Sequence, residues 1–330
     1  MAENIDKENM IKVLDNFWKQ CEEASMLGND IKVSFPINGI IFCGMGGSAI
    51  PGDIIKSYIE LSYPVEIVRD YKIPAWADKN TLVFIASYSG NTEEALSCFK
   101  SAKAKGTKIV CITSGGKLKK FCEDSKTPLI IVPSGIQPRD AIGYQTLPLL
   151  NVLINSKIIS STAKDDIKDM VGLLRKDIKE EAEALAKKLV NKIPLIYSSD
   201  RMVSVARAWK TKINENAKAQ AFFNVFPEMN HNEMVGFTNL KADYYAIFID
   251  DKDDHPRIKK RMEITKKLLN EKRCPVLILK LTGPNRLARI FSCILLGSYV
   301  GYYLALEYGT DPTPVKMVED LKKELGEYIK

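Results

Sequence analysis

The sequence predicts an α/β protein built from two doubly wound parallel sheets, with an additional helix at each end of the chain. Short apolar segments of β type alternate with helical segments between residues 39 and 132, and a second such series begins at residue 193. This alternation is typical of parallel strands whose connecting helices cover both faces of a sheet. A chain of 330 residues is long enough for two domains of this kind. We place them at residues 1–155 and 156–330.

The first domain is expected to begin with an amphipathic helix over residues 5–27, because apolar side chains recur along one stripe of that segment. The stripe consists of Ile11, Leu14, Phe17, Trp18 and Cys21. Strands are expected near residues 39–44, 64–69, 81–86, 107–112 and 128–132. Residues 142–192 are expected to be helical, and their charged part, 165–192, connects the two domains.

The second domain is expected to have a similar architecture with different loops. Its strands are predicted at residues 193–198, 244–249 and 275–279. Its helices are predicted at residues 201–219, 256–272, 284–308 and 314–328. The loops that follow these strands lack the combination of glycine and hydroxyl side chains found in the first domain, so we expect the anion site in the first domain.

Composition excludes several classes of function. The 48 Lys and Arg residues exceed the 41 Asp and Glu residues, which mildly suits an anionic substrate. These charges are scattered, with no basic arm or basic–aromatic stripe, so nucleic acid is not an expected partner. Apolar stretches are short or interrupted, so no membrane span is expected. The N-terminus does not resemble a signal peptide, and none of the seven cysteines forms a Cys-x-x-Cys pair, so we expect a cytoplasmic protein with reduced cysteines.

The most informative stretch is Ser87-Tyr88-Ser89-Gly90-Asn91-Thr92, between an apolar strand and a helix that opens with Glu93. Free N–H groups and the dipole at a helix N-terminus favour a bound anion. Ser87, Ser89 and Thr92 supply hydroxyl donors, and Gly90 permits close approach of the backbone. A simple turn followed by a Thr-capped helix is the alternative, and this segment by itself does not decide between them.

A second loop has the same order of strand, glycine turn, hydroxyl and helix. Gly44-Met45-Gly46-Gly47-Ser48-Ala49 follows the strand at residues 40–43 and precedes a helix. Ligands of open α/β sheets bind beyond the carboxyl ends of the strands, so both loops could face one ligand. The loop also fits Gly-x-Gly-x-x-Ala, with Asp70 further along, so dinucleotide binding is an alternative. The hydroxyls at residues 87–92 favour a terminal phosphate instead.

Four further residues are candidates for chemistry. Arg139 precedes a helix beyond a strand end, where it could face the ligand or pair with Asp140. Glu215, at the end of a long helix, is a possible base or a solvated side chain. His231 is one of two histidines and the more plausible acid or base, because His255 lies in a polar turn. Lys316 is unfavourable in the first turn of a helix, which suggests another role. No His/Cys cluster is present, so no metal site is expected.

Taken together, these motifs resemble those of the bifunctional phosphoglucose/phosphomannose isomerases, which are built from two sugar-isomerase (SIS) domains. The resemblance covers essentially the whole chain. It rests on Gly44–Ser48, Ser87–Thr92, Pro138-Arg139, Asn214-Glu215-Asn216, Pro227–Glu233 and Asp311–Val315. It implies two SIS-like subdomains and reversible conversion of glucose 6-phosphate and mannose 6-phosphate to fructose 6-phosphate, a role in glycolysis and gluconeogenesis. It also implies that no cofactor is used, and that a homodimer forms in which His231 is supplied across the interface.

The resemblance assigns roles that suit the chemistry of these side chains. His231 would open the sugar ring, and Glu215 would carry a proton between C2 and C1 through a cis-enediol or enediolate. Arg139 would stabilise the negative charge of that intermediate. The phosphate would be bound by Gly46, Gly47, Ser48, Ser87, Ser89 and Thr92. Lys316 would assist ring opening or hold the substrate, and Thr310 and Thr313 are weak candidates for setting tolerance at C2.

Three other functions are alternatives. One is an isomerase for an amino sugar phosphate or for glucose 6-phosphate only. A second is a non-catalytic sugar-phosphate sensor, which would not need Glu215 or His231. The third is a nicotinamide-dependent oxidoreductase that uses the glycine loop.

Overall fold

The computed structural model describes residues 5–326, which form two compact units. The first-sheet unit contains Asn16–Lys168 together with the segment that begins at Pro314. The second-sheet unit contains the residues up to Asp15 together with Asp169–Thr313. Each unit is thus discontinuous in sequence, and the boundary between residues 155 and 156 stays a prediction.

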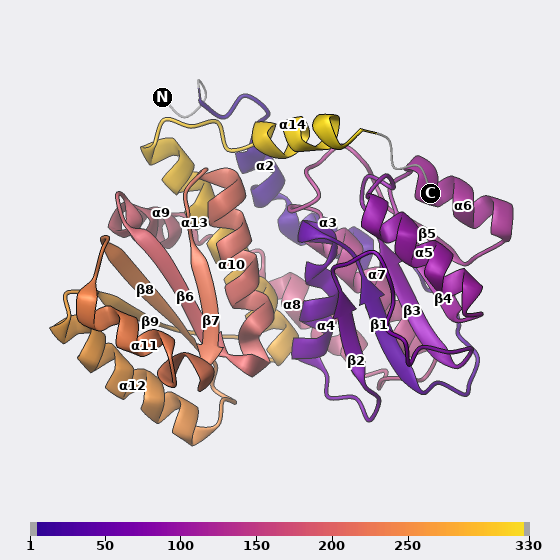
Figure 1. The fold of residues 1–330 in the computed structure, drawn as a ribbon, viewed down its shortest axis with the longest axis horizontal. Helices are drawn as coiled ribbons and strands as arrows, with labels where there is room; N and C mark the ends of the chain where they lie inside the picture. Colours follow the sequence, from indigo (N-terminus) through magenta and orange to yellow (C-terminus); the bar gives the residue numbers. More distant parts are fainter. Residues whose placement is uncertain (1–4, 327–330) are drawn as a thin grey trace. The chain divides into compact units, whose positions relative to one another are not determined.

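The first-sheet unit contains a parallel sheet whose five described strands lie in the order β2-β1-β3-β4-β5 (Figure 1). Their bounds are β1 (Gly39–Cys43), β2 (Val65–Val68), β3 (Thr81–Ala86), β4 (Lys108–Thr113) and β5 (Leu129–Ile131). All five are predicted strands, and they confirm the α/β class. Strands β1 and β3 are buried along their whole length, which explains their continuous apolar sequences.

Helices cover both faces of this sheet. Helices α5 (Glu93–Ala104) and α6 (Gly116–Ser125) pack on the face that carries Ile41 and Val83. Helix α4 (Ile50–Tyr58) lies on the opposite face, where Gly52 contacts Phe42. Helix α7 (Ile142–Asn155) packs against α4 and against α3 (Phe17–Ala24).

Two predicted helical stretches are interrupted. The helix expected over residues 5–27 is divided into α2 (Met10–Asp15) and α3, because Asn16, with φ −99° and ψ 12°, lies outside the helical region. The stretch 142–192 contains α7, α8 (Ala163–Leu173) and α9 (Lys179–Leu189). After α7 the chain turns at Lys157, whose φ is 56°. An apolar stripe continues across such breaks, so it does not reveal them.

The second-sheet unit contains a parallel sheet with the order β7-β6-β8-β9 among its described strands. Strands β6 (Ile193–Ser199), β8 (Tyr244–Asp250) and β9 (Val276–Lys280) match the predicted ones. Strand β7 (Phe222–Phe226) was not predicted. It is a short edge strand, mostly half-buried or exposed, and Asn224 interrupts its apolar residues, so it lacks the sequence signal of a buried strand.

Helices again lie on both faces of the second sheet. Helix α12 (Pro256–Glu271) packs on one face, and α10 (Val203–Asn216), α13 (Arg286–Glu307) and α9 pack together on the other. These helices and α14 (Lys316–Leu325) lie within the predicted ranges. Helix α13 has the length and apolar composition of a membrane span, but 78% of its most apolar window is buried inside the protein, as in the core helix of a folded domain.

The contact between α10 and α13 depends on a glycine. The Trp209 indole is completely buried and donates a hydrogen bond to the carbonyl of Cys293, 2.8 Å away. A Cβ atom at Gly297 would lie 2.6 Å from the indole ring. The two helices therefore approach closely only because position 297 has no side chain.

We predict that Gly297→Ala lowers the free energy of unfolding by about 1–3 kcal/mol, because overpacking a tight core forces neighbouring groups apart. Denaturant unfolding measures this. The control is Gly172→Ala in α8, where a Cβ atom would meet nothing within 4 Å; it should leave stability unchanged or raise it by up to ~1 kcal/mol. Equal effects of the two substitutions would contradict tight packing of Trp209.

Candidate functional site

The loop at residues 87–92 connects β3 to α5 and brings hydroxyl groups together. The Ser87 hydroxyl donates to Thr92 Oγ1 over 3.0 Å and accepts a long hydrogen bond from the Thr92 N–H at 3.4 Å. Thr92 occupies the N-cap position of α5, but its side chain makes no capping hydrogen bond. Its hydroxyl is directed instead to Ser87, so the loop is more than a Thr-capped helix. Ser89 is exposed at the top of the same loop.

The glycine loop after β1 lies beside this loop. Ser48 Oγ accepts a hydrogen bond from the Tyr88 N–H, 3.2 Å away, which joins the two loops directly. A Cβ atom at Gly47 would lie 2.8 Å from the backbone of Arg139, so the loop also packs on the Pro138-Arg139 segment. The structure therefore brings Ser48, Ser87, Thr92 and the backbone of Arg139 to one edge of the first sheet.

A third loop, after β4, supports the first and was missed by sequence reasoning. The Ser114 N–H and hydroxyl both donate to the Tyr88 carbonyl, at 3.0 and 2.6 Å. A Cβ atom at Gly90, whose φ is +70°, would lie 1.8 Å from the Gly115 carbonyl oxygen. The Ser-Gly-Gly sequence at residues 114–116, directly after a strand, was the available signal. These bonds fix the backbone of the loop at residues 87–92.

The Arg139 side chain is almost completely buried, with 1% exposure. Its Nε lies 3.9 Å from Asp140 Oδ2, and its Nη1 donates a long hydrogen bond of 3.5 Å to Gln137 Oε1. The pairing with Asp140 that sequence reasoning left open is therefore present. The Arg139 guanidinium belongs to the first-sheet unit, which also contains the hydroxyl loops.

Glu215 lies in the last turn of α10 in the second-sheet unit, and its side chain is half-buried. Hydrogen bonds hold the turn that follows Glu215 in place. The Lys218 ammonium donates to the carbonyls of Glu215, Asn216 and Pro312, at 2.7, 3.2 and 2.9 Å. These bonds connect the end of α10 to the segment that leads to Thr313, whose N–H donates to Asp311 Oδ1. Lys218 is a residue that sequence reasoning did not single out.

His231 is exposed and follows a short 3-10 turn, Glu228–Asn230, in the second-sheet unit. Its neighbours on both sides are anchored. The Asn230 amide donates to Thr265 Oγ1 over 2.9 Å, and the Glu233 carboxylate accepts hydrogen bonds from the Tyr197 hydroxyl and the Asn224 amide. Burial raises the pKa of Tyr197, and Glu233 raises it further, so this hydroxyl stays a donor. An exposed imidazole is thus held on a fixed backbone.

The remaining candidates are distributed as follows. Lys316 is exposed and begins α14, which belongs to the first-sheet unit. That unit therefore holds Lys316 and the hydroxyl loops, whereas Glu215 and His231 belong to the second-sheet unit. Among residues 5–326, no group of three His, Cys, Asp or Glu side chains is arranged to hold a metal ion.

The corresponding edge of the second sheet is closed by an internal ion pair. The Arg289 guanidinium, 1% exposed, donates through Nε to Asp251 Oδ2 over 2.6 Å and through Nη2 to Asp253 Oδ2 over 2.5 Å. Beside them, the Ser199 hydroxyl donates to Asp254 Oδ1 over 2.5 Å, and burial raises the pKa of Asp254. Because the charge of Arg289 is already balanced by these carboxylates, this edge of the second sheet does not favour the binding of an anion.

Comparison with known proteins identifies the class first. A SIS-domain family model matches residues 36–126, and the model of the bacterial phospho-glucose isomerase C-terminal SIS domain matches residues 178–325. The fold is similar to the C-terminal domain of glucosamine-fructose-6-phosphate aminotransferase from Francisella tularensis, with a TM-score of 0.73 at 16% identity, covering 93% of this chain and 98% of that one. The protein is therefore a two-domain SIS protein.

Curated relatives define the family more narrowly. The bifunctional phosphoglucose/phosphomannose isomerase of Caldicellulosiruptor bescii is 41% identical over 96% of this chain and 99% of its own length. That of Aquifex aeolicus is 37% identical, over 97% and 99% of the two chains. The chain belongs to the bifunctional phosphoglucose/phosphomannose isomerase family, as the sequence motifs predicted.

We predict that Gly90→Ala weakens the binding of sulfate, used as a phosphate probe, by about tenfold or more, since the new Cβ atom would displace the loop from Gly115. Titration calorimetry measures this. The matched control is Gly106→Ala, whose φ of +65° is similar but whose Cβ atom would meet nothing within 4 Å. It should cost about 1 kcal/mol of stability and leave sulfate affinity intact. Equal sulfate affinity in both variants would contradict an anion site at residues 87–92.

Proposed function

We propose that this protein interconverts glucose 6-phosphate and mannose 6-phosphate with fructose 6-phosphate, by metal-free proton transfer through a cis-enediol or enediolate. The observation that carries the proposal is the joined pair of hydroxyl loops at the first sheet, within a chain that belongs to this family. Ser48 binds the backbone of Tyr88, and the Ser87 and Thr92 hydroxyls lie 3.0 Å apart at the N-terminus of α5. Such a group of donors at a helix N-terminus suits a dianionic phosphate.

The phosphate would serve as a handle remote from the reacting carbons. Hydroxyls of Ser48, Ser87, Ser89 and Thr92, with the backbone at Gly46 and Gly47, would hold it without taking part in proton transfer. Binding energy from a remote group helps to place the reacting atoms of the open sugar. The rigid hydrogen bonding among the loops supports this role, because donors that are fixed in advance lose little conformational freedom when the ligand binds.

Four side chains are proposed to carry the chemistry. His231 would donate and accept the proton of ring opening, because imidazole is the side chain most often used for acid–base catalysis and this one is exposed. Glu215 would remove the C2 proton and return it to C1. Arg139 would stabilise the enediolate, and its burial supports this, because a charge acts more strongly in a poorly solvated site. Lys316 would assist ring opening or hold the substrate.

A single base can account for the conversion of both aldoses. Glucose 6-phosphate and mannose 6-phosphate differ only at C2, and deprotonation of that carbon gives the same enediol from either. One base can therefore serve both epimers if the site tolerates rotation about the C2–C3 bond. Thr310 and Thr313 remain weak candidates for setting that tolerance; Thr313 is buried.

We predict that Glu215→Gln lowers turnover of both aldoses together by about a thousandfold, ~4 kcal/mol in activation free energy, with substrate binding largely retained. A coupled assay on fructose 6-phosphate, with EDTA present, should report the two products separately. The control is Glu271→Gln, an exposed carboxylate at the end of α12 in the same unit.

Several results would contradict the proposal. Near-normal turnover in Glu215→Gln would make this carboxylate a surface residue, and loss of only one activity would exclude a shared base. Glucose 6-phosphate as sole product would favour the narrower isomerase, and conversion only of an amino sugar phosphate would favour that alternative. Activity that disappears with EDTA and returns with zinc would exclude metal-free catalysis, and oxidation of NADH would favour the oxidoreductase.

We also propose a cytoplasmic homodimer that acts in glycolysis and gluconeogenesis, with His231 donated to the partner's site. The exposure of His231 on an anchored segment supports donation to a partner. We predict that mixing inactive Glu215→Gln and His231→Ala homodimers, followed by subunit exchange, restores activity, because each heterodimer then has one complete site. Native mass spectrometry verifies the exchange. Confirmed exchange without recovered activity would place both residues in the same subunit's site.

A further inference from the structure

The two units repeat one order of elements, with one omission (Figure 1). In the first-sheet unit the chain runs from β3 through α5 to β4, then through α6 and β5 to α7. In the second-sheet unit it runs from β8 through α12 to β9 and then directly to α13. The second sheet therefore has no described counterpart of β5, and β9 is its edge strand.

The hydrogen bonds between β9 and β8 show which backbone groups of β9 face its open edge. The Pro275 carbonyl accepts from the Ala246 N–H, and the Leu281 N–H donates to the Asp250 carbonyl, both at 2.9 Å. In a strand, the N–H and C=O groups of alternate residues point to opposite sides. The groups of Ile278 and Lys280 therefore point away from β8, toward the open edge.

The first sheet shows how these positions are filled when a fifth strand is present. In that sheet, Cys111 and Thr113 of β4 point away from β3, as Ile278 and Lys280 of β9 point away from β8. The Cys111 N–H donates to the Pro128 carbonyl over 2.9 Å, and the Thr113 carbonyl accepts from the Val132 N–H over 3.0 Å. These two bonds flank the pairing of β4 with β5. Their counterparts at β9 have no strand beside them in the described part of the chain.

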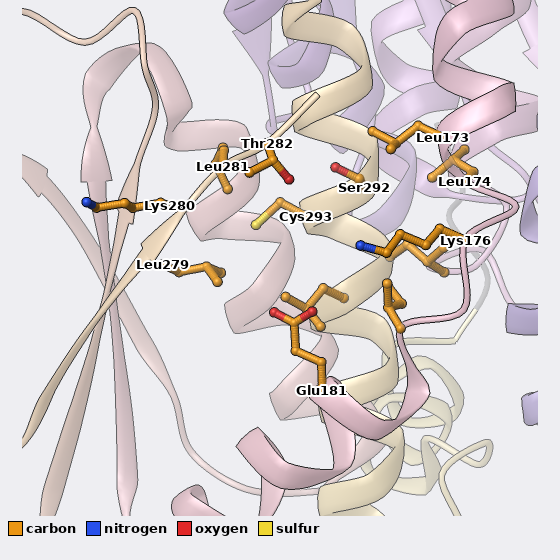
Figure 2. Close-up of a pocket in the computed structure, with 13 residues that line it drawn as sticks. Leu173, Leu174, Lys176, Glu181, Leu279, Lys280, Leu281, Thr282, Ser292 and Cys293 are labelled. Carbon is orange, nitrogen blue, oxygen red and sulfur yellow. The ribbon is translucent and has the colours of Figure 1, made fainter. Parts of the chain in front are cut away.

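A cavity of about 110 Å³ with a mixed polar and apolar lining lies beside the end of β9 (Figure 2). It is lined by Leu279 of β9 and Leu281 just after it, by Ser292 and Cys293 of α13, and by residues from the segment 173–181. Residues 277–279 of β9 are apolar and only half-buried. An exposed apolar edge is a template for pairing with another strand, and such edges are usually shortened, charged or covered.

The charges around the edge indicate the chemistry of the occupant. Exposed cations lie at both ends of β9, Arg273 before it and Lys280 as its last residue, and Lys176 lines the cavity. Within residues 5–326 none of these three cations has a carboxylate within 4 Å. The carboxylates nearby are Asp177, Glu180 and Glu181 in the segment of Lys176, Glu271 close to Arg273 in sequence, and Asp250 opposite Lys280 on β8. A segment with acidic side chains at both ends would complement this edge.

We propose that the open edge of β9 binds an extended segment of another protein, which consists of three or more apolar residues flanked by acidic side chains. The segment adds to the sheet as a fifth, parallel strand. Its backbone accepts a hydrogen bond from the Ile278 N–H and donates one to the Lys280 carbonyl, and its apolar side chains cover the cavity beside Leu279. This is strand addition at a sheet edge, in which backbone bonds supply affinity and side chains supply specificity.

The test uses a fluorescent synthetic peptide with the sequence of residues 127–133, which carry β5, extended by glutamates at both ends. A second peptide carries lysines instead. Fluorescence anisotropy at low salt should show saturable binding of the acidic peptide, at least about tenfold tighter than that of the basic one. Hydrogen exchange of the Ile278 and Lys280 amides should slow when the acidic peptide binds.

Two variants locate the binding. Ile278→Pro removes an outward N–H, a substitution that sheet edges tolerate. Because the Ile278 side chain packs on the core of the second-sheet unit, the melting temperature should fall by a few degrees, but the near-UV circular dichroism should stay unchanged and binding should be lost. If that variant does not fold, Arg273→Glu with Lys280→Glu serves instead and should reverse the preference to the basic peptide. Absence of binding, binding that survives Ile278→Pro in a folded protein, or unchanged preference after charge reversal would overturn the proposal. Self-association that Ile278→Pro abolishes would overturn it in favour of a second copy as occupant. None of these results depends on the proposed isomerase activity.

Discussion

The close approach of backbone to backbone at the carboxyl edge of the first sheet is the constraint on which the candidate site depends. Three loops, after β1, β3 and β4, meet there. Gly47 lies against the backbone of Arg139, and Gly90 lies against the backbone of Gly115. Both contacts are so close that a Cβ atom at either glycine would clash with the opposite backbone. Because these positions lack side chains, the hydroxyls of Ser48, Ser87 and Thr92 can gather at one helix N-terminus. The proposed anion-binding chemistry depends on that contact.

The second unit has the same layered plan but a different solution at the same edge. There the loop after β8 is filled by carboxylates that bind Arg289 and Ser199. A buried guanidinium paired in this way stabilises its surroundings only as long as both partners remain, since an unpaired buried charge is costly. The same fold therefore presents a cluster of hydroxyl groups, the proposed anion site, in one unit and an internal ion pair in the other, because the composition of the loops differs.

The catalytic proposal places different demands on the two units. Phosphate binding requires preorganised donors, which hydrogen bonds between loops supply. Proton transfer requires side chains that can reach the substrate. In the second-sheet unit, hydrogen bonds therefore hold the backbone next to Glu215 and His231 and leave the two side chains themselves accessible. Lys218 ties the turn after Glu215, and Asn230 and Glu233 anchor the segment that carries His231. If Glu215 and His231 act as proposed, these rigid supports would let them do so without disturbing the core.

The amino-acid sequence by itself determined most of the strands, the α/β class and the two hydroxyl loops, because each of these is a local pattern. A buried parallel strand is a continuous apolar run, and a strand followed by glycines, hydroxyls and a helix is a pattern of a few residues that predicts an anion loop. The family motifs were local for the same reason. Strand β7 was not predicted because a half-exposed edge strand with Asn224 in its middle lacks a continuous apolar run.

Only the tertiary structure decided which features meet. It revealed that the loop at residues 114–116 supports the loop at residues 87–92, and that Arg139 is buried beside Asp140. It also revealed that Arg289 closes the second sheet and that β9 has an open edge. These facts depend on contacts between residues far apart in the chain and on the order of strands in each sheet. Local periodicity carries no information about either, because the same apolar run forms a central strand or an edge strand according to what packs beside it.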